Sequence, residues 1–329
     1  MVGRELLHFL EKSRLPVGEL RPFSSGSAGK TVPFRGRALQ APPVDKKTLY
    51  GCGLVFFVSS DEISIQHSPG LAARGVLVID DSSAFRLDPK VPLVIPEVNG
   101  HVLRRRLRLI AGPNCTMTPL AVAGIALHRA VGVTEVRLAT YQSVSGAGRA
   151  ALEEFFRQVR GHGRLAVKGR APVLHSSIPH QALPKPIAYN VIPQVGGFDQ
   201  RGCSGEESKV ASELRKVWDA PTLRVSVTAV RVPVVRGHSM SAWLTLRRPI
   251  SPAAARKLLA KTPGLKLSAD GDYPTPLLVG GKGPVYAGRI RQGATPRELC
   301  LWLSYDNLIK GAALNSVQIA EELLKKGWL

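Results

Sequence analysis

The sequence has no long hydrophobic run. No apolar stretch approaches the roughly 20 residues that a helix needs to cross a bilayer, and the opening residues, Met1 to Glu5, lack the apolar core of a signal peptide. With 329 residues, 44% of them hydrophobic, the chain is long enough for two domains with their own cores. We therefore expect a soluble, globular, cytoplasmic protein that has no membrane partner.

Cysteine is also scarce. The four cysteines, Cys52, Cys115, Cys203 and Cys300, lie far apart in the chain. This spacing matches neither the close pairs of a zinc site nor a dense disulfide framework. We expect free thiols and no metal site.

Acidic and aromatic residues are few as well. There are 24 Asp and Glu against 45 Lys and Arg, a net charge of +21, and aromatic residues make up 6% of the chain. Such a charge can mark a nucleic-acid-binding protein. However, basic residues are scattered apart from the run at 104–108, with no basic tail, zinc-finger spacing or aromatic stacking motif. We therefore expect no specific nucleic-acid function, and interpret the positive field as one that attracts a small anionic substrate and cofactor.

Short apolar runs alternate with helical patterns in the first hundred residues. This alternation predicts parallel α/β structure. The expected helix covers 4–12, and the expected strands cover 53–58, 75–79 and 91–95.

The pattern changes after the first hundred residues, where longer strands are only partly separated by helices. This mixture predicts an α+β domain with a broad, mostly antiparallel sheet. The expected strands are 136–140, 188–193, 224–232, 239–247, 285–291 and 299–304; the expected helices are 119–131, 149–160, 206–218 and 252–261. Residues 312–326 have the apolar stripe of a final amphipathic helix that packs back on the body.

Cys115 is the main candidate for chemistry. Gly112 and Pro113 precede it, and helically spaced apolar residues follow, so Cys115 is expected at a helix N-terminus. Unpaired amides and the helix dipole lower a thiol pKa there, and the thiolate is the form that attacks a carbonyl carbon. His238, in the run Arg-Val-Pro-Val-Val-Arg-Gly-His, is the candidate acid/base partner.

Two further segments carry polar residues at the ends of expected elements. Residues 140–148 read Thr-Tyr-Gln-Ser-Val-Ser-Gly-Ala-Gly, a strand that ends in a turn of small residues where the backbone can approach a ligand. Residues 205–209 read Gly-Glu-Glu-Ser-Lys, with acidic residues at a helix start and a lysine one turn later.

Taken together, these segments resemble the aspartate-semialdehyde dehydrogenase family over the whole chain. Each motif alone is a weak match, but their order is specific. They are Ile-Asp-Asp-Ser-Ser-Ala-Phe-Arg at 79–86, Pro-Glu-Val-Asn at 96–99, Pro-Asn-Cys at 113–115, Gln-x-Val-Ser-Gly-Ala-Gly at 142–148, Asn-Val-Ile-Pro at 190–193, the run at 231–238, Asp-Asn-Leu at 306–308 and Lys-Gly-Ala-Ala at 310–313.

The resemblance implies two domains. A Rossmann-like dinucleotide-binding domain is expected over 1–114, completed by the C-terminal helix at 308–329, and a catalytic and dimerisation domain over 115–307. The implied assembly is a homodimer, with pairing into tetramers left open. The family begins with a strand and a Gly-Ala-Thr-Gly-x-Val-Gly loop, of which only Met1-Val2-Gly3 is present. We expect the first strand to be missing from the sheet, and an upstream start would explain this.

The resemblance also implies an activity, the reductive dephosphorylation of L-aspartyl 4-phosphate to L-aspartate 4-semialdehyde for lysine, threonine and methionine biosynthesis. Cys115 matches the nucleophile that forms a thioester, and His238 the general acid/base. The other matching positions are Gln142 for orienting the substrate, Arg231 for its carboxylate, Glu206 for its ammonium, Arg86 and Lys209 for phosphate, and Asn114 for the anion-stabilising pocket.

The implied cofactor is NADP. The expected contacts are Val2, Gly3, Ser24, Ser27, Ser145, Gly146 and Asn307. The family usually carries an arginine where Gly26 stands, and the loop at 59–62 has two acids where small residues are common. We therefore expect that this protein can use NAD as well as NADP.

Other interpretations remain at this point. An N-acetyl-glutamyl-phosphate reductase runs the same chemistry on a longer acyl phosphate, although the Gln142 turn favours the aspartyl enzyme. A non-catalytic paralogue that has lost cofactor binding would fit the missing loop, yet Cys115, Gln142, Arg231 and His238 are all present. Taken singly, His238 could be structural, and Arg86 and Lys209 could be surface charges.

Overall fold

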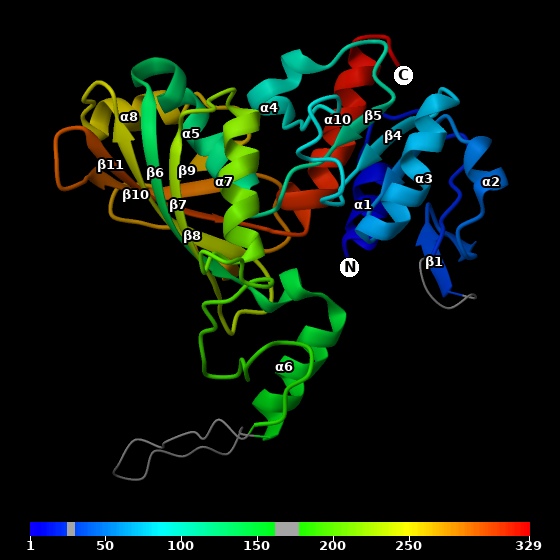
Figure 1. The fold of residues 1–329 in the computed structure, drawn as a ribbon, viewed down its shortest axis with the longest axis horizontal. Coiled ribbons are helices and arrows are strands. Elements are labelled where there is room, and N and C mark those ends of the chain that lie inside the picture. The colour runs from blue at the N-terminus through cyan, green and yellow to red at the C-terminus, as the bar shows by residue number, and fades with distance from the viewer. Residues whose placement is uncertain (25–29, 162–177) are drawn as a thin grey trace. The chain divides into compact units, whose positions relative to one another are not determined.

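The structure, a computed structural model, describes residues 1–24, 30–161 and 178–329 (Figure 1). It divides into two compact units. Unit 1 comprises 1–125, 212–222 and 308–329, and unit 2 comprises 126–211 and 223–307. Within the described ranges, no helix combines the length and the apolar character needed to cross a membrane.

A parallel sheet with both faces covered forms the centre of unit 1. Its strands β3 (Leu54–Phe57), β4 (Leu77–Asp80) and β5 (Leu109–Ala111) pair in that order. Side chains of β4 alternate between faces: Leu77 and Ile79 join one apolar cluster, and Val78 joins the other. Because both faces are buried, the strand reads as a continuous apolar run.

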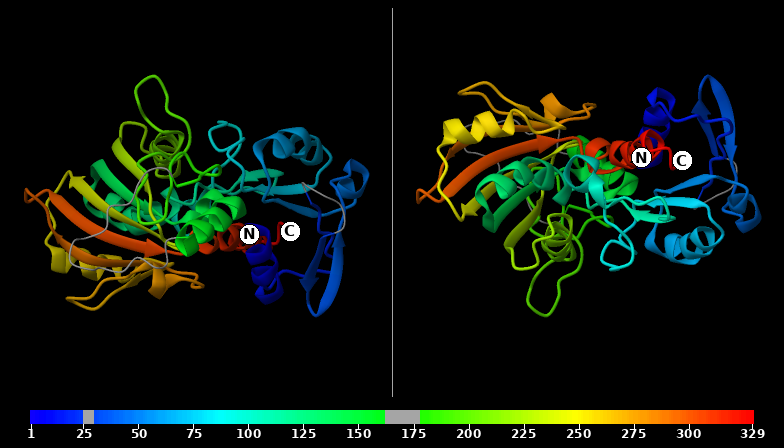
Figure 2. Two further views of the ribbon diagram at one scale, coloured as in Figure 1. Left: turned by 90° about the horizontal axis from the view of Figure 1, so that it is seen from below. Right: turned by 90° about the horizontal axis from the view of Figure 1, so that it is seen from above.

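Helices cover the two faces of this sheet. On one face, α1 (Val2–Lys12) and α10 (Leu314–Lys325) pack side by side, as Figure 2 shows, and α10 also contacts β4 and α4 (Pro96–Asn99). On the other, α3 (Asp61–Ala73) packs against β4 and β5, with α2 (Lys46–Tyr50) beside it. The 3-10 turn η1 (Gly100–Val102) follows α4.

Unit 1 also contains a hairpin that the sequence analysis does not predict. Strands β1 (Lys30–Phe34) and β2 (Arg37–Ala41) pair antiparallel around a two-residue turn. Arg35 and Gly36 both have positive φ angles, 48° and 73°. Positive φ at both central residues is the type I′ turn, whose twist matches that of the flanking strands.

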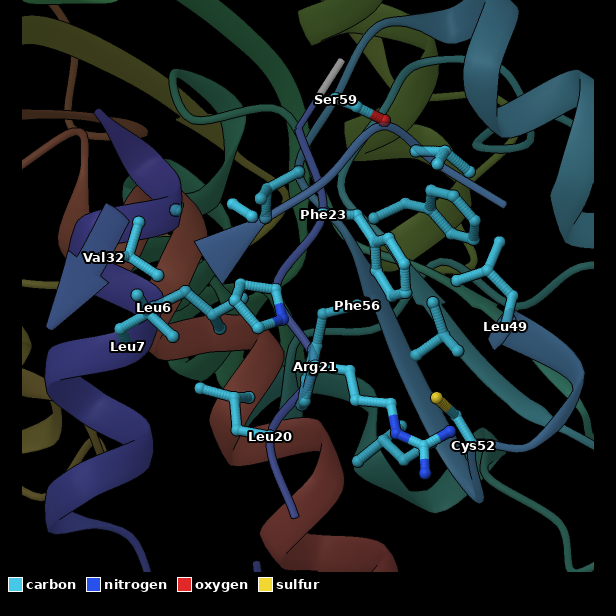
Figure 3. Close-up of a pocket in the computed structure, with 18 of the residues that line it drawn as sticks. Leu6, Leu7, Leu20, Arg21, Phe23, Val32, Leu49, Cys52, Phe56 and Ser59 are labelled. Atoms are coloured by element: carbon cyan, nitrogen blue, oxygen red, sulfur yellow. The ribbon is translucent and has the colours of Figure 1, made fainter. Parts of the chain in front are cut away.

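An apolar cavity of about 370 Å³ lies beside β3 (Figure 3). Its other walls come from residues 19–23 and from α1, and the side chains of Phe23, Phe56 and Leu49 reach into it. Among the described residues, β3 pairs only with β4 and has its second edge unpaired. A strand in this position has a free row of backbone donors and acceptors.

A six-stranded mixed sheet forms the centre of unit 2, in the order β7-β6-β8-β11-β10-β9. Pairs β6–β8, β8–β11 and β10–β11 are antiparallel, whereas β6–β7 and β9–β10 are parallel. The strands are β6 (Val133–Gln142), β7 (Arg224–Arg231), β8 (His238–Leu246), β9 (Leu265–Leu267), β10 (Val285–Gln292) and β11 (Glu298–Tyr305).

The remaining helices complete the chain. Helix α8 (Pro252–Leu259) packs against β9 and β10. Helices α5 (Met117–Val131) and α7 (Gly205–Val217) each have residues in both units. The others are η2 (Val144–Ala147), α6 (Arg149–Gly161), α9 (Pro276–Val279) and the π-helical turn η3 (Ile309–Ala313).

The expected fold class, a Rossmann-like α/β domain with an α+β partner, is confirmed, but two predicted strands are wrong. At 91–95 only Leu93 bridges to Ala111, because Pro92 has no N–H to donate and Pro96 begins α4. At 188–193 only Ile192 bridges to Arg231. Tyr189, with φ 59°, interrupts the extended backbone there.

A buried ion pair anchors the start of the final helix within unit 1. The Lys310 ammonium donates to both carboxylate oxygens of Glu97, at 2.9 and 2.7 Å, and to the amide oxygens of Asn315 and Gln318. Burial lowers the pKa of Lys310, while the Glu97 charge opposes this shift. With four acceptors around it, the ammonium is fully hydrogen-bonded, which a buried charge requires. The sequence motifs at 96–99 and 310–313 thus have a structural use.

Candidate functional site

Cys115 lies at the start of α5, as the sequence analysis expects. The helix begins at Met117, and the side-chain oxygen of Asn114 accepts from the N–H groups of Thr116, at 2.7 Å, and Met117, at 3.0 Å. This is the geometry of an N-terminal cap. Cys115 is half-buried, with its sulfur 3.9 Å from the Thr116 hydroxyl. The cap holds the thiol at the positive end of the helix dipole, where a thiolate is favoured.

Arg86 belongs to the same cluster in unit 1. Its guanidinium is buried, pairs with Glu213 at 3.0 Å and donates to the carbonyl of Asp81 at 2.6 Å. Burial alone would lower the pKa of Arg86, but the charges of Glu213, Asp81 and Cys115 raise it. The arginine therefore stays charged beside the thiol. It is no surface charge, and its predicted role with phosphate stays a prediction.

Gly311 packs directly against Cys115 within unit 1. A Cβ at this position would lie 2.7 Å from the Cβ of Cys115, closer than real Cβ atoms approach. Gly311 belongs to the π-helical turn η3, which precedes α10. Short π-helical segments are frequent at functional sites. The glycine in the motif at 310–313 is thus explained by the space that Cys115 needs.

A second cluster forms at one edge of the sheet in unit 2. Strands β6 and β7 run parallel and end opposite each other at Gln142 and Arg231. Strand β8 begins at the same edge with His238. The sheet topology therefore brings together three residues that are far apart in the sequence.

His238 is fully buried at this edge. Its Nδ1 accepts the backbone N–H of Ser143 at 3.0 Å and lies 2.9 Å from the Ser143 hydroxyl. An accepted N–H at Nδ1 assigns the proton of the neutral ring to Nε2. In the described part of the chain, Nε2 has no hydrogen-bond partner. Burial first, and the charge of Arg231 second, hold the pKa of His238 well below its usual 6.5.

Gln142, Arg231 and Glu206 also lie in this cluster. The Gln142 amide donates to the Glu206 carboxylate at 3.0 Å, and the Arg231 guanidinium donates to the Ser143 carbonyl at 2.8 Å. Lys209, also on α7, is exposed. The predicted catalytic residue Gln142 and the predicted substrate-binding residues Arg231 and Glu206 are thus brought together with His238, while their roles stay predictions.

Gly146 leaves room for the side chains of Arg231 and His238 in unit 2. A Cβ there would lie 2.8 Å from an Arg231 nitrogen and 3.0 Å from His238 Nε2. We expect Gly146→Ala to displace both groups. For the dehydrogenase activity that the family resemblance implies, kcat/KM should fall by about 10- to 100-fold, as it does when reacting groups are misplaced. Steady-state kinetics measure this, with Gly197→Ala as the control because its added methyl meets nothing within 4 Å. Equal effects of the two substitutions would contradict the prediction.

Two of the predicted cofactor contacts in unit 2 are engaged locally. The side-chain oxygen of Asn307 accepts from the hydroxyls of Ser143 and Ser145, at 3.2 Å each, and from the N–H of Gly237 at 3.1 Å. Asn307 and Ser145 therefore hold the loop that contacts His238. Their contact with a cofactor stays a prediction, as does that of Gly146.

In unit 1, the carboxyl ends of the parallel strands are the place where a dinucleotide would bind. Ligands of parallel α/β sheets bind at the carboxyl ends of the strands. Ser59 follows β3 there, with a buried hydroxyl that has no hydrogen-bond partner among the described residues. The Asp61 carboxylate, one of the two acids in this loop, accepts from the Ser83 N–H and hydroxyl at 2.7 and 2.6 Å.

The other predicted cofactor contacts of unit 1 lie near its amino end. Val2 and Gly3 open α1, and Ser24 is fixed by a bridge to Pro43. Ser27 lies outside the described residues, as does Gly26. Cofactor contact by these residues stays a prediction.

Sequence reasoning missed three residues of these clusters. Gly311 stands inside a motif quoted for the family resemblance, and Ser143 lies in the segment of small residues at 140–148, so the sequence offered a signal for both. Glu213 had none, because it is one acid in an ordinary amphipathic helix, 99 residues from its partner Asn114 in the chain.

Two family models match the chain. One, described as the NAD binding domain of semialdehyde dehydrogenase, covers residues 1–106. The other, described as the semialdehyde dehydrogenase dimerisation domain, covers residues 125–310.

Curated relatives and solved structures agree with these matches. An aspartate-semialdehyde dehydrogenase from Synechocystis sp. is 39% identical over 100% of this chain and 96% of the relative, and one from Aquifex aeolicus is 36% identical over 99% and 96%. Crystal structures of aspartate semialdehyde dehydrogenase II from Vibrio cholerae, one of them complexed with ASA, match with a TM-score of 0.91 and 35% identity, covering 98% of this chain and 95% of theirs.

Proposed function

Because the chain belongs to the semialdehyde dehydrogenase family, we propose that it is an aspartate-semialdehyde dehydrogenase that converts L-aspartyl 4-phosphate to L-aspartate 4-semialdehyde through a thioester on Cys115. The observation that carries the proposal is the capped helix start that holds the Cys115 thiol beside the buried cation of Arg86. The product fits a place in lysine, threonine and methionine biosynthesis.

The first step is acyl transfer to sulfur. The Cys115 thiolate attacks the acyl carbon, a carbon–sulfur bond forms, and the carbon–oxygen bond to phosphate breaks so that phosphate leaves with the bonding pair. Arg86 and Lys209 are the cations proposed to bind this leaving group. Arg231 binds the substrate carboxylate with its planar guanidinium, and Glu206 binds the ammonium.

The second step needs a hydride at the thioester carbon and a hydrogen-bond donor at its oxygen. NADPH, when bound, supplies the hydride for the thioester carbon. His238 acts on the oxygen of that carbon: its neutral ring carries hydrogen on Nε2, which it donates to the oxygen as negative charge develops there and takes back as the aldehyde C=O bond re-forms. The carbon–sulfur bond breaks in the same collapse and Cys115 leaves as thiolate, so thioester plus hydride gives aldehyde plus thiolate with no net proton. In the oxidative direction the ring acts on the same oxygen in the reverse order.

We also propose NADP as the main cofactor, with NAD as a second one. The absence of the usual arginine at Gly26 supports dual use. The Asp61 carboxylate in the neighbouring loop already accepts hydrogen bonds from Ser83, which supports NADP as the main cofactor because one acid fewer is left there to repel its 2′-phosphate. A homodimer is the proposed assembly, on the support of the dimerisation-domain match.

One assay tests the proposal against its alternatives. Phosphate-dependent oxidation of aspartate semialdehyde is measured with NADP and with NAD, beside N-acetyl-glutamate semialdehyde as competing substrate. We expect phosphate-dependent turnover of aspartate semialdehyde, with a higher kcat/KM for NADP than for NAD. A higher kcat/KM for the N-acetyl-glutamyl aldehyde would identify the reductase instead, and no turnover with either aldehyde would identify the non-catalytic paralogue.

A further inference from the structure

Glu213 is a buried carboxylate that the proposed mechanism does not use. It lies on α7 in the part of the helix that belongs to unit 1, and its side chain is 1% exposed. One oxygen accepts from the Arg86 guanidinium at 3.0 Å, and the other accepts from the backbone N–H of Asn114 at 2.7 Å. A single side chain thus joins the residue before the nucleophile to the cation beside it.

We propose that Glu213 is a positioning residue, which fixes residues 113–115 (the nucleophile loop) at Asn114 and offsets the charge of Arg86 next to Cys115. The inference rests on the proposed function, in which Cys115 attacks and Arg86 binds phosphate. Arg86 is held at two points, by Glu213 and by the carbonyl of Asp81, so its guanidinium has one orientation. Without Glu213, the loop N–H and the guanidinium would both lose a buried acceptor.

Two side chains at the end of α7 also hydrogen-bond to backbone carbonyls of unit 1. The Lys216 ammonium donates to the carbonyls of Arg86, Asp88 and Val91, at 2.8, 2.7 and 2.8 Å. The Trp218 indole donates to the carbonyl of Ala121 in α5, at 3.2 Å. In the chain, these acceptors come before and after the nucleophile loop. The bonds hold Glu213 in reach of its two partners.

The charges around Arg86 decide the direction of the effect. The groups that face it are Glu213, Asp81 and Cys115, whose charges all act on its pKa. Burial raises the pKa of Asp81 to about 6, so Asp81 is ionised throughout the range in which a thiol titrates. If the carboxylate of Glu213 becomes a neutral amide, the cation of Arg86 is offset less, and a Cys115 thiolate becomes more favourable.

Glu213→Gln is the decisive variant, because an amide can still accept one of the two bonds but carries no charge. The rate of alkylation of Cys115 by iodoacetamide is followed by peptide mass between about pH 7 and pH 10. We expect the midpoint of its pH dependence to fall by about one unit. We also expect the KM for phosphate to rise about 10-fold, because Arg86 is no longer fixed.

Glu207→Gln is the matched control. Glu207 also lies on α7, and its carboxylate also accepts two hydrogen bonds, here both from backbone N–H groups, of Ser204 at 2.6 Å and Ala229 at 2.8 Å, all within unit 2. We expect its alkylation midpoint and KM for phosphate to match the parent protein. A structural role alone would lower stability in both variants without moving the midpoint.

Glu213→Asp separates the effect of the charge from the effect of side-chain length. It also replaces the glutamine variant in this test if that variant does not fold. It keeps the negative charge on a shorter side chain, so the alkylation midpoint should stay in place while the KM for phosphate rises. An unchanged or higher midpoint in Glu213→Gln, or a lowered midpoint in Glu213→Asp, would overturn the proposal. Alkylation needs no cofactor or substrate, so a parent protein without turnover would refute the proposed function and leave this comparison intact.

Discussion

Replacing Cys115 with alanine is expected to lower phosphate-dependent oxidation of aspartate semialdehyde by about 10⁴-fold or more, as the loss of a covalent nucleophile does. Alanine keeps the helix start, because the cap comes from Asn114 and the contact with Gly311 involves the Cβ, which alanine retains. The fold should therefore persist while the chemistry is lost. Steady-state rates and circular dichroism measure the two effects.

A half-reaction gives a second measure of the same substitution. Acyl transfer from L-aspartyl 4-phosphate to Cys115 releases phosphate without any dinucleotide, so the parent protein should show a burst of about one phosphate per active site. The alanine variant should show none. Cys203→Ala is the control, since Cys203 is half-buried like Cys115. A burst of parental size in the Cys115 variant would refute the nucleophile assignment.

The thiol's place in the fold follows from local sequence, but its electrostatic surroundings do not. Gly112 and Pro113 end the preceding strand, and helically spaced apolar residues follow Cys115, so the helix start could be predicted from this segment alone. Glu213 reaches the same loop from 99 residues away. Only the packing of α7 on the loop brings the two together, and no local pattern marks such a contact.

The strands show the same limit. The long strands of unit 2 were predicted within a few residues: β6 and β8 largely alternate between buried and less buried positions, and β11 is an almost wholly buried apolar strand. The segments at 91–95 and 188–193 carry equally apolar residues, but prolines and the positive φ of Tyr189 leave each with a single bridge. The hairpin at β1 and β2 was missed because its Arg35-Gly36 turn is not one of the common turn dipeptides.

His238→Asn is expected to lower kcat by about 10² to 10⁴-fold, the range that a general acid/base contributes. Asparagine places an oxygen near the position of Nδ1, where it can accept the Ser143 N–H, but it has nothing at Nε2. The proton donor is lost while the loop is kept. Because binding of the substrate carboxylate is assigned to Arg231, KM should change only a few-fold.

The same variant tests the protonation state of the buried ring through stability. Burial and the charge of Arg231 hold the pKa of folded His238 well below 6.5, so the unfolded chain binds a proton more readily than the folded one. The neutral ring's contribution to stability is present above about pH 6.5 and is lost as the pH falls below it. In His238→Asn, the free energy of unfolding should therefore fall less between about pH 7.5 and pH 5.

Urea unfolding at the two pH values measures this difference, and His101→Asn supplies the control because His101 is exposed. The control should keep both the parental rate and the parental loss of stability in acid. A steeper acid dependence in His238→Asn would mean that the folded ring is charged. A charged ring could not accept the Ser143 N–H at Nδ1, and the assignment of the catalytic proton to Nε2 would fail with it.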